Sequence, residues 1–170
     1  YIKNQRHYEV HMKKVLFIDF FLPPLAADWR GISFVQLLPK NKWEPIILTS
    51  HESVKYDKDY SLLRFYPKDI NIHRVKYKDK KGIITRLLIR FKLYFIYPDA
   101  YKNWIKPAIK KALKLANEEN ISLIYSASPT IATAFVALHV HKKTSIPWIA
   151  DFLDGWYVND FLMRYYDKSL

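Results

Sequence analysis

The chain of 170 residues contains no cysteine and only three glycines. Without cysteine it can have no disulfide framework, no thiolate nucleophile and no thiolate metal site. With glycine only at positions 31, 82 and 155, it has neither the G-x-G-x-x-G turn nor the P-loop that hold phosphate groups in many nucleotide-binding proteins. The longest apolar runs, such as 15–22, have the length of a strand and fall short of a membrane span.

What the chain does contain is typical of one folded domain. Half of the residues are apolar and 16% are aromatic, which excludes a disordered chain. The length suits a single domain with its own core. Because Met12 and two lysines resemble a natural start, we expect residues 1–11 to be a leader or extension and residues 12–170 to form the domain.

The positive charge is concentrated in one part of the chain. The net charge is +12, from 28 lysines and arginines against 16 acidic residues. Residues 74–115 hold thirteen of the basic residues and only two acidic ones. A basic face of this kind indicates a polyanionic partner, which is either anionic lipid or nucleic acid.

The order of apolar and amphipathic segments predicts the fold class. Strands are expected at 15–21, 45–49, 62–66, 72–77, 121–125 and 147–150, and helices at 31–38, 106–117 and 131–141. Strands that alternate with helices predict an α/β fold with a Rossmann-like, doubly wound and mostly parallel sheet. Ligands of such sheets bind beyond the carboxyl ends of the strands, so the loops at 22–30, 126–130 and 151–156 are the places to look for a site.

The segment 82–97 is amphipathic and basic. Arg86, Arg90 and Lys92 lie beside an apolar stripe of isoleucine, leucine and phenylalanine. One interpretation is a helix that faces the core and has a solvated basic side. The other is a surface helix that lies in an anionic headgroup layer, with these three residues in contact with the membrane.

Four motifs resemble those of bacterial family-four glycosyltransferases, which have the GT-B fold. IPWIADFLDGW at 146–156 is similar to that family's IPWVADFRDPW. Residues 20–49 resemble its proline-rich loop and the helix and strand that follow, and 97–104 its YPD and tryptophan. SASPT at 126–130 resembles its STSPP. The motifs occur in the family's order, and the likeness is to its N-terminal, acceptor-side domain.

The resemblance implies a function for the chain. It would be the acceptor-binding half of a retaining glycosyltransferase that uses a nucleotide-activated sugar in cell-surface polysaccharide or glycolipid synthesis. The family binds the nucleotide-sugar mainly through a C-terminal domain that residues 12–170 do not include, so this half alone is expected to be inactive. The expected partners are an acceptor glycan or lipid-linked sugar and an anionic membrane surface, without a cofactor, metal or nucleic acid, in the cytoplasm on the inner face of the membrane. The alternative is a non-catalytic module that binds nucleic acid or another polyanion.

Asp151 and Arg30 are the first candidates for site residues. Asp151 ends a predicted strand, where a carboxylate either caps a turn or faces a ligand. The resemblance implies that it contacts the transferred sugar, as the catalytic residue. Arg30 is either a solvated arginine at the start of a helix or a clamp for a phosphate group.

The remaining candidates are four small polar residues. Ser126, Ser128 and Thr130 lie between a strand and a helix, where they either cap the helix or bind an anion at its N-terminus. Asp154 either caps the segment after it or binds substrate. No pair of histidines has a spacing that suits a metal site.

Overall fold

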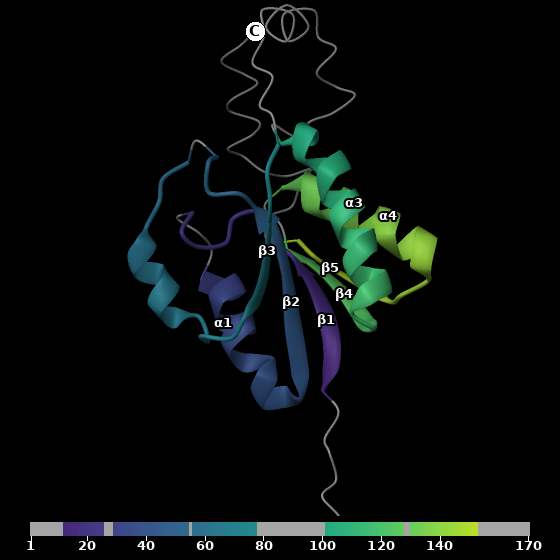
Figure 1. Ribbon diagram of the computed structural model, residues 1–170, viewed down its shortest axis with the longest axis horizontal. Coiled ribbons are helices and arrows are strands. Elements are labelled where there is room, and N and C mark those ends of the chain that lie inside the picture. The colour runs from purple at the N-terminus through teal and green to yellow at the C-terminus, as the bar shows by residue number, and fades with distance from the viewer. Residues whose placement is uncertain (1–11, 26–28, 55, 78–100, 128–129, 153–170) are drawn as a thin grey trace, which may run out of the picture.

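Five parallel strands form the centre of the molecule. A computed structural model describes residues 12–25, 29–54, 56–77, 101–127 and 130–152 (Figure 1). The strands are Lys13–Ile18 (β1), Trp43–Ser50 (β2), Asn71–Val75 (β3), Ile121–Ala127 (β4) and Trp148–Asp151 (β5). They pair in the order β3-β2-β1-β4-β5, and every pairing between these five strands is parallel; an isolated antiparallel bridge joins Leu25 and Lys58 outside the sheet. The expected mostly parallel sheet is thus confirmed, and it is parallel throughout the described part.

Helices cover both faces of this sheet. Trp29–Leu37 (α1) packs on one face, and Lys102–Glu118 (α3) and Ile131–Thr144 (α4) pack side by side on the other (Figure 1). Two short 3₁₀ helices, Pro39–Asn41 (η1) and Tyr60–Phe65 (η2), belong to the α1 side. This arrangement is the expected Rossmann-like, doubly wound α/β fold.

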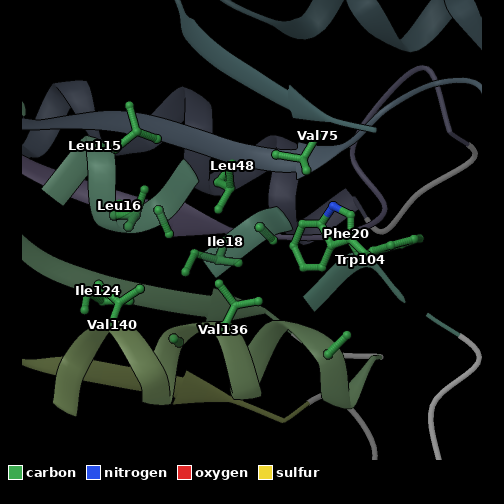
Figure 2. Close-up of a cluster of buried hydrophobic side chains, with 14 of the residues drawn as sticks. Leu16, Ile18, Phe20, Leu48, Val75, Trp104, Leu115, Ile124, Val136 and Val140 are labelled. Carbon is green, nitrogen blue, oxygen red and sulfur yellow. The ribbon is translucent and has the colours of Figure 1, made fainter. Parts of the chain in front are cut away.

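The alternation of side chains along the strands gives each face of the sheet its own core. On the α3 and α4 side, Leu16 and Ile18 of β1 pack with Trp104 and Val136 in a large buried cluster (Figure 2). On the α1 side, Phe17 packs with Leu22, Val35, Ile47 and Tyr125 in a smaller one. Because both faces are buried, β1 and β2 read as continuous apolar runs in the sequence.

Two predicted strands differ from the structure. The segment predicted as a strand at 62–66 belongs to η2, because Asp59 accepts a hydrogen bond from the backbone N–H of Ser61 (2.8 Å) and starts a helical turn. The first strand stops at Ile18 rather than at residue 21. There the carboxylate of buried Asp19 accepts the N–H of Phe21 (3.0 Å), and the chain turns away from the sheet.

The helix predicted at 106–117 begins four residues earlier, at Lys102, and contains Pro107. Proline in a helix interior removes a backbone hydrogen bond, which is why the sequence favours a later start. Trp104 and Ala108, on either side of Pro107, are both fully buried, and this packing offsets the loss. The amphipathic segment 82–97 lies outside the described residues.

Candidate functional site

Three side chains meet at the carboxyl edge of the sheet. The guanidinium Nη1 of Arg30 lies 3.2 Å from Oδ1 and 3.1 Å from Oδ2 of Asp151. The hydroxyl of Tyr125 donates a hydrogen bond to Oδ2 of the same carboxylate. We name Arg30, Tyr125 and Asp151 the carboxylate cluster.

The fold brings these residues together from distant parts of the sequence. Asp151 is the last residue of β5 and lies beside Ala127 of β4. Tyr125 is two positions earlier on β4, so the two side chains project from the same face of the sheet. Arg30 is in the first turn of α1, which covers that face. The cluster therefore lies where ligands bind in open α/β sheets.

Aromatic packing holds Tyr125 in place. Its ring stacks on Phe17 with centroids 4.9 Å apart, and Phe34 of α1 lies 5.0 Å away on a tilted plane. The tyrosine is a rigid donor, because its two neighbours restrict the ring. Its hydroxyl fixes the orientation of the Asp151 carboxylate.

The environment keeps the tyrosine protonated. Burial raises the pKa of Tyr125 well above its usual range, and the hydrogen bond to the Asp151 carboxylate raises it further. The side chains of Arg30 and Asp151 are 33% and 25% exposed, so the ion pair can be reached from solvent. The cluster can thus offer a hydrogen-bond acceptor and a fixed cation to a ligand that approaches from outside.

An apolar hollow adjoins the cluster. It has a volume of about 430 Å³ and follows the outer side of α1. Trp29, Phe34 and Leu37 line it and are well exposed. Since Arg30 also lines the hollow, a molecule bound there would lie next to the carboxylate cluster.

The predicted site residues in the turn before α4 do not lie in the carboxylate cluster. Ser126 is buried and accepts a hydrogen bond from Nε1 of Trp148 (2.9 Å), so its side chain is on the α3 and α4 side of the sheet. Thr130 precedes α4 without capping it through its side chain, and its buried Oγ1 has no hydrogen-bond partner in the described part of the chain. Instead, the Thr133 hydroxyl lies 2.8 Å from the Thr130 carbonyl oxygen.

The structure thus brings two of the predicted site residues together, Arg30 and Asp151. Ser126 and Thr130 do not join that pair. Ser128, Asp154 and the three basic residues Arg86, Arg90 and Lys92 lie outside the described residues. Within the described ranges, no three acidic or histidine side chains lie close enough to hold a metal ion.

Sequence reasoning missed Tyr125 and Arg74. Arg74 of β3 donates through Nη2 to the carbonyl oxygen of Pro23, and burial lowers its pKa. The hydroxyls of Thr49 and Ser50 both donate to the Phe20 carbonyl oxygen, at 3.2 and 2.7 Å. These bonds hold the loop that leads towards α1 and Arg30. The sequence offered one signal for such residues, because they are polar and lie near the ends of strands that are otherwise apolar.

Comparisons with known proteins show the fold. No protein-family model matches the chain, and neither does any curated protein sequence. Among solved structures, the C-terminal domain of the PF1911 hydrogenase from Pyrococcus furiosus has a TM-score of 0.52 at 13% identity, over 82% of this chain and 91% of that one. A glycosyltransferase from Rickettsia africae ESF-5 has a TM-score of 0.50 at 16% identity, over 91% of this chain and 33% of that one.

This chain therefore spans about a third of the length of the Rickettsia glycosyltransferase that it resembles. A predicted subunit of a tRNA methyltransferase from Methanocaldococcus jannaschii, with a TM-score of 0.39, is too dissimilar to bear on the fold. At these identities the likeness concerns architecture alone. The chain has a Rossmann-like α/β fold that a glycosyltransferase shares.

Proposed function

We propose that this chain is the acceptor-binding half of a retaining glycosyltransferase that uses a nucleotide-activated sugar. The observation that carries the proposal is the carboxylate cluster at the carboxyl edge of a sheet shared with a glycosyltransferase. The acceptor is a glycan or lipid-linked sugar of cell-surface polysaccharide or glycolipid synthesis. The nucleotide-sugar is held mainly by a second domain of the parent protein.

Each member of the cluster has a role in this proposal. Asp151 accepts a hydrogen bond from a hydroxyl of the transferred sugar or of the acceptor, and this contact strengthens as the transition state forms. Tyr125 keeps the carboxylate oriented towards that hydroxyl. Arg30 holds an anionic group of the substrate when it leaves Asp151.

The proposal needs no metal ion. The leaving diphosphate is neutralised by basic side chains and helix N-termini, which can stabilise developing charge in the same way as a bound cation. Arg30 is a described side chain of this kind at the edge of the sheet.

Membrane contact completes the proposed setting. The enzyme acts in the cytoplasm at the inner face of the membrane, and Arg86, Arg90 and Lys92 contact anionic lipid. None of the helices in the described ranges has both the length and the apolar character needed to cross a bilayer. We propose this contact as a peripheral one.

The test is the Asp151→Asn variant of the full-length parent, assayed for sugar transfer to a membrane extract. We expect turnover to fall at least a hundredfold, roughly 2.7 kcal/mol of transition-state stabilisation, with little change in the unfolding temperature. Asp57→Asn, at an exposed residue, is the matched control and should keep full activity. Wild-type turnover in Asp151→Asn would show that Asp151 has no catalytic role.

A further inference from the structure

An inclined row of lysines runs along the outer side of α3. Lys102, Lys106, Lys110 and Lys114 are all exposed and occur at every fourth residue. With a rise of 1.5 Å per residue, neighbouring members are about 6 Å apart along the helix axis. Lys114 lies 3.8 Å from Glu118, whereas the first three lysines have no ion pair within the described ranges. We name Lys102, Lys106 and Lys110 the α3 lysine row.

The whole layer that contains this row is basic. Residues 101–144 contain seven lysines and two glutamates, with no arginine and no aspartate. Both glutamates are at the C-terminal end of α3, and Glu119 pairs with Lys14 at 2.8 Å. The α1 side is balanced in contrast, since residues 40–69 contain six basic and five acidic residues. Residues 101–144 therefore carry a larger excess of positive charge than residues 40–69.

The lysine row begins at the same edge of the sheet as the carboxylate cluster. α3 follows β3 and leads into the parallel strand β4, so its N-terminus lies at the carboxyl edge (Figure 1). Trp104 in its first turn anchors that end, with its ring 5.2 Å from Phe20 just beyond β1 (Figure 2). Beside the row is an open groove of about 530 Å³, lined by Lys102, Lys106 and His139 among others.

We infer that the α3 lysine row is a docking surface for an anionic phospholipid headgroup layer. This inference rests on the proposed function, and it assigns to α3 a contact with the membrane that carries the acceptor. Each lysine near an anionic surface contributes electrostatic attraction, and the contributions of the three lysines add together. In the docked orientation α3 lies along the headgroup layer, and the carboxyl edge of the sheet is at the end of α3 where the row begins.

Two features favour a lipid surface over nucleic acid. The basic residues of the layer are all lysines, which act as point charges, whereas arginine is the residue that reads phosphates and bases through paired hydrogen bonds. In addition, the row is flanked by half-buried isoleucines rather than by the aromatic rings on which single-stranded bases stack.

The mode of binding follows from the packing of α3. Its apolar side, with Trp104, Ala108, Ala112 and Leu115, is buried against the sheet, so α3 cannot also insert into the acyl layer. Binding by the row is therefore adsorption through charge. Salt should screen it strongly, because the Debye length falls from about 10 Å at 0.1 M to about 3 Å at 1 M.

The experiment is sedimentation of the whole chain with vesicles of phosphatidylglycerol and phosphatidylcholine, compared with phosphatidylcholine alone, at low and high salt. The triple variant Lys102→Gln, Lys106→Gln and Lys110→Gln should bind the anionic vesicles at least tenfold more weakly. The control changes Lys40, Lys58 and Lys68 to glutamine, which alters the net charge equally at exposed positions on the α1 side. The control should lose no more than about threefold, an effect of net charge alone.

Three outcomes would overturn the inference. They are an equal loss in the two variants, equal binding to neutral and anionic vesicles, and tighter binding to a single-stranded oligonucleotide than to anionic vesicles. Thermal unfolding of both variants confirms that the fold is intact. Sugar transfer by the parent to a detergent-solubilised acceptor is measured separately, so a failure of membrane docking is distinguishable from a failure of the proposed function.

Discussion

At the scale of single residues, the carboxylate of Asp151 is shared between two donors of different kinds. Arg30 is a charged donor on a helix, and Tyr125 is a neutral donor fixed in the sheet. Because the ion pair is a quarter to a third exposed, its contribution to folding is about 1 kcal/mol or less. A ligand can therefore displace Arg30 at low cost, while Tyr125 continues to hold the carboxylate.

The Tyr125→Phe variant tests the role of the tyrosine hydroxyl. Phenylalanine keeps the stacking on Phe17 but removes the donor to Asp151. We expect the free energy of unfolding in urea to fall by about 1–2 kcal/mol, the usual cost of losing a hydrogen bond to a charged group. Tyr60→Phe, at a side chain that is 58% exposed, should change it by less than about 0.5 kcal/mol. Equal effects in the two variants would contradict the assignment.

A second prediction concerns pH and His73 of β3. Burial lowers the pKa of His73, and the nearby charge of Lys111 lowers it further. The folded protein thus binds this proton less readily than the unfolded chain does. The stability is therefore present above the unfolded pKa of about 6.5 and is lost as the pH falls from there through the lower folded pKa. The free energy of unfolding should therefore decline as the pH is lowered from 8 to 5. The His73→Gln substitution should reduce the slope of this free energy against pH.

His51 provides the control for this experiment because it is solvent-accessible and its Nδ1 contacts the nearby Ser53 hydroxyl. His51→Gln is measured in parallel as a histidine substitution outside β3. A slope that is the same in wild type and in His73→Gln would show that other groups determine the acid sensitivity.

The sequence alone placed Arg30 and Asp151 at loops of the carboxyl edge, because both follow the apolar segments that become strands. It could not show that they touch, since they are 121 residues apart and their contact depends on the strand order. Tyr125 could not be identified as a site residue from the sequence for another reason. In the sequence it belongs to an apolar strand, and only the ending of β5 at Asp151 gives its hydroxyl a partner.

At the scale of elements, the start of α1 is fitted closely to the loop after β1. A β-carbon added at Gly31 would lie 2.7 Å from Cδ2 of Leu22 and 2.9 Å from Oδ2 of Asp19. Both neighbours are buried and cannot move freely. Glycine at this position thus allows the helix to approach the loop, and this approach sets the position of Arg30.

The Gly31→Ala substitution has two opposing effects on stability, and the usual size of each is known. Alanine favours the helix by up to about 1 kcal/mol, but crowding in a packed core costs about 1–3 kcal/mol. We expect a net loss of about 1–2 kcal/mol in the free energy of unfolding. Ser33→Ala, at an exposed position of the same helix, combines the helix preference with loss of the hydrogen bond from the Ser33 hydroxyl to the Trp29 carbonyl oxygen (2.9 Å), and should change stability by less than about 0.5 kcal/mol. A stabilised Gly31→Ala protein would show that the loop after β1 shifts to accommodate the added β-carbon.

Helices and strands were predictable to different degrees. β2 and β4 follow from short runs of apolar residues and α4 from a longer apolar segment, because strands and helices differ in length. η2 and the first turn of α3 did not follow, since one depends on the cap at Asp59 and the other on the burial of Trp104 beside Pro107. In both cases particular contacts determine the local conformation, and the periodicity of the sequence does not reveal those contacts.

At the scale of the whole molecule, the sheet has the reversal of strand order that creates a binding crevice in open α/β folds. β1 lies between β2 and β4, and the connection from β1 to β2 through α1 covers one face of the sheet, whereas the connection from β3 to β4 through α3 covers the other. Chemistry and charge are then divided between the faces, with the carboxylate cluster under α1 and the lysine row on α3. A protein built this way can approach a charged surface with one side while a site at the shared edge stays accessible.

If the nucleotide-sugar is held mainly by a second domain, this chain alone should bind it weakly. We expect calorimetry with UDP- and GDP-sugars to give dissociation constants well above about 1 μM, which corresponds to −8.2 kcal/mol. The isolated chain should also transfer no sugar. A micromolar constant for any donor would place the nucleotide site within this chain and contradict the proposed division of roles between the two domains.

The central position of β1 also has a consequence for how the chain is made. Its second partner, β4, is distant in sequence, as shown by Lys14 and Glu119, which pair across 105 residues. Such contacts form slowly because a long loop must close first. During synthesis, β1, β2 and β3 emerge with one edge of β1 still unpaired, and an open edge invites pairing with other chains. Truncation before β4 should therefore yield insoluble protein, and the yield of the whole chain should depend on how quickly residues 121–127 follow.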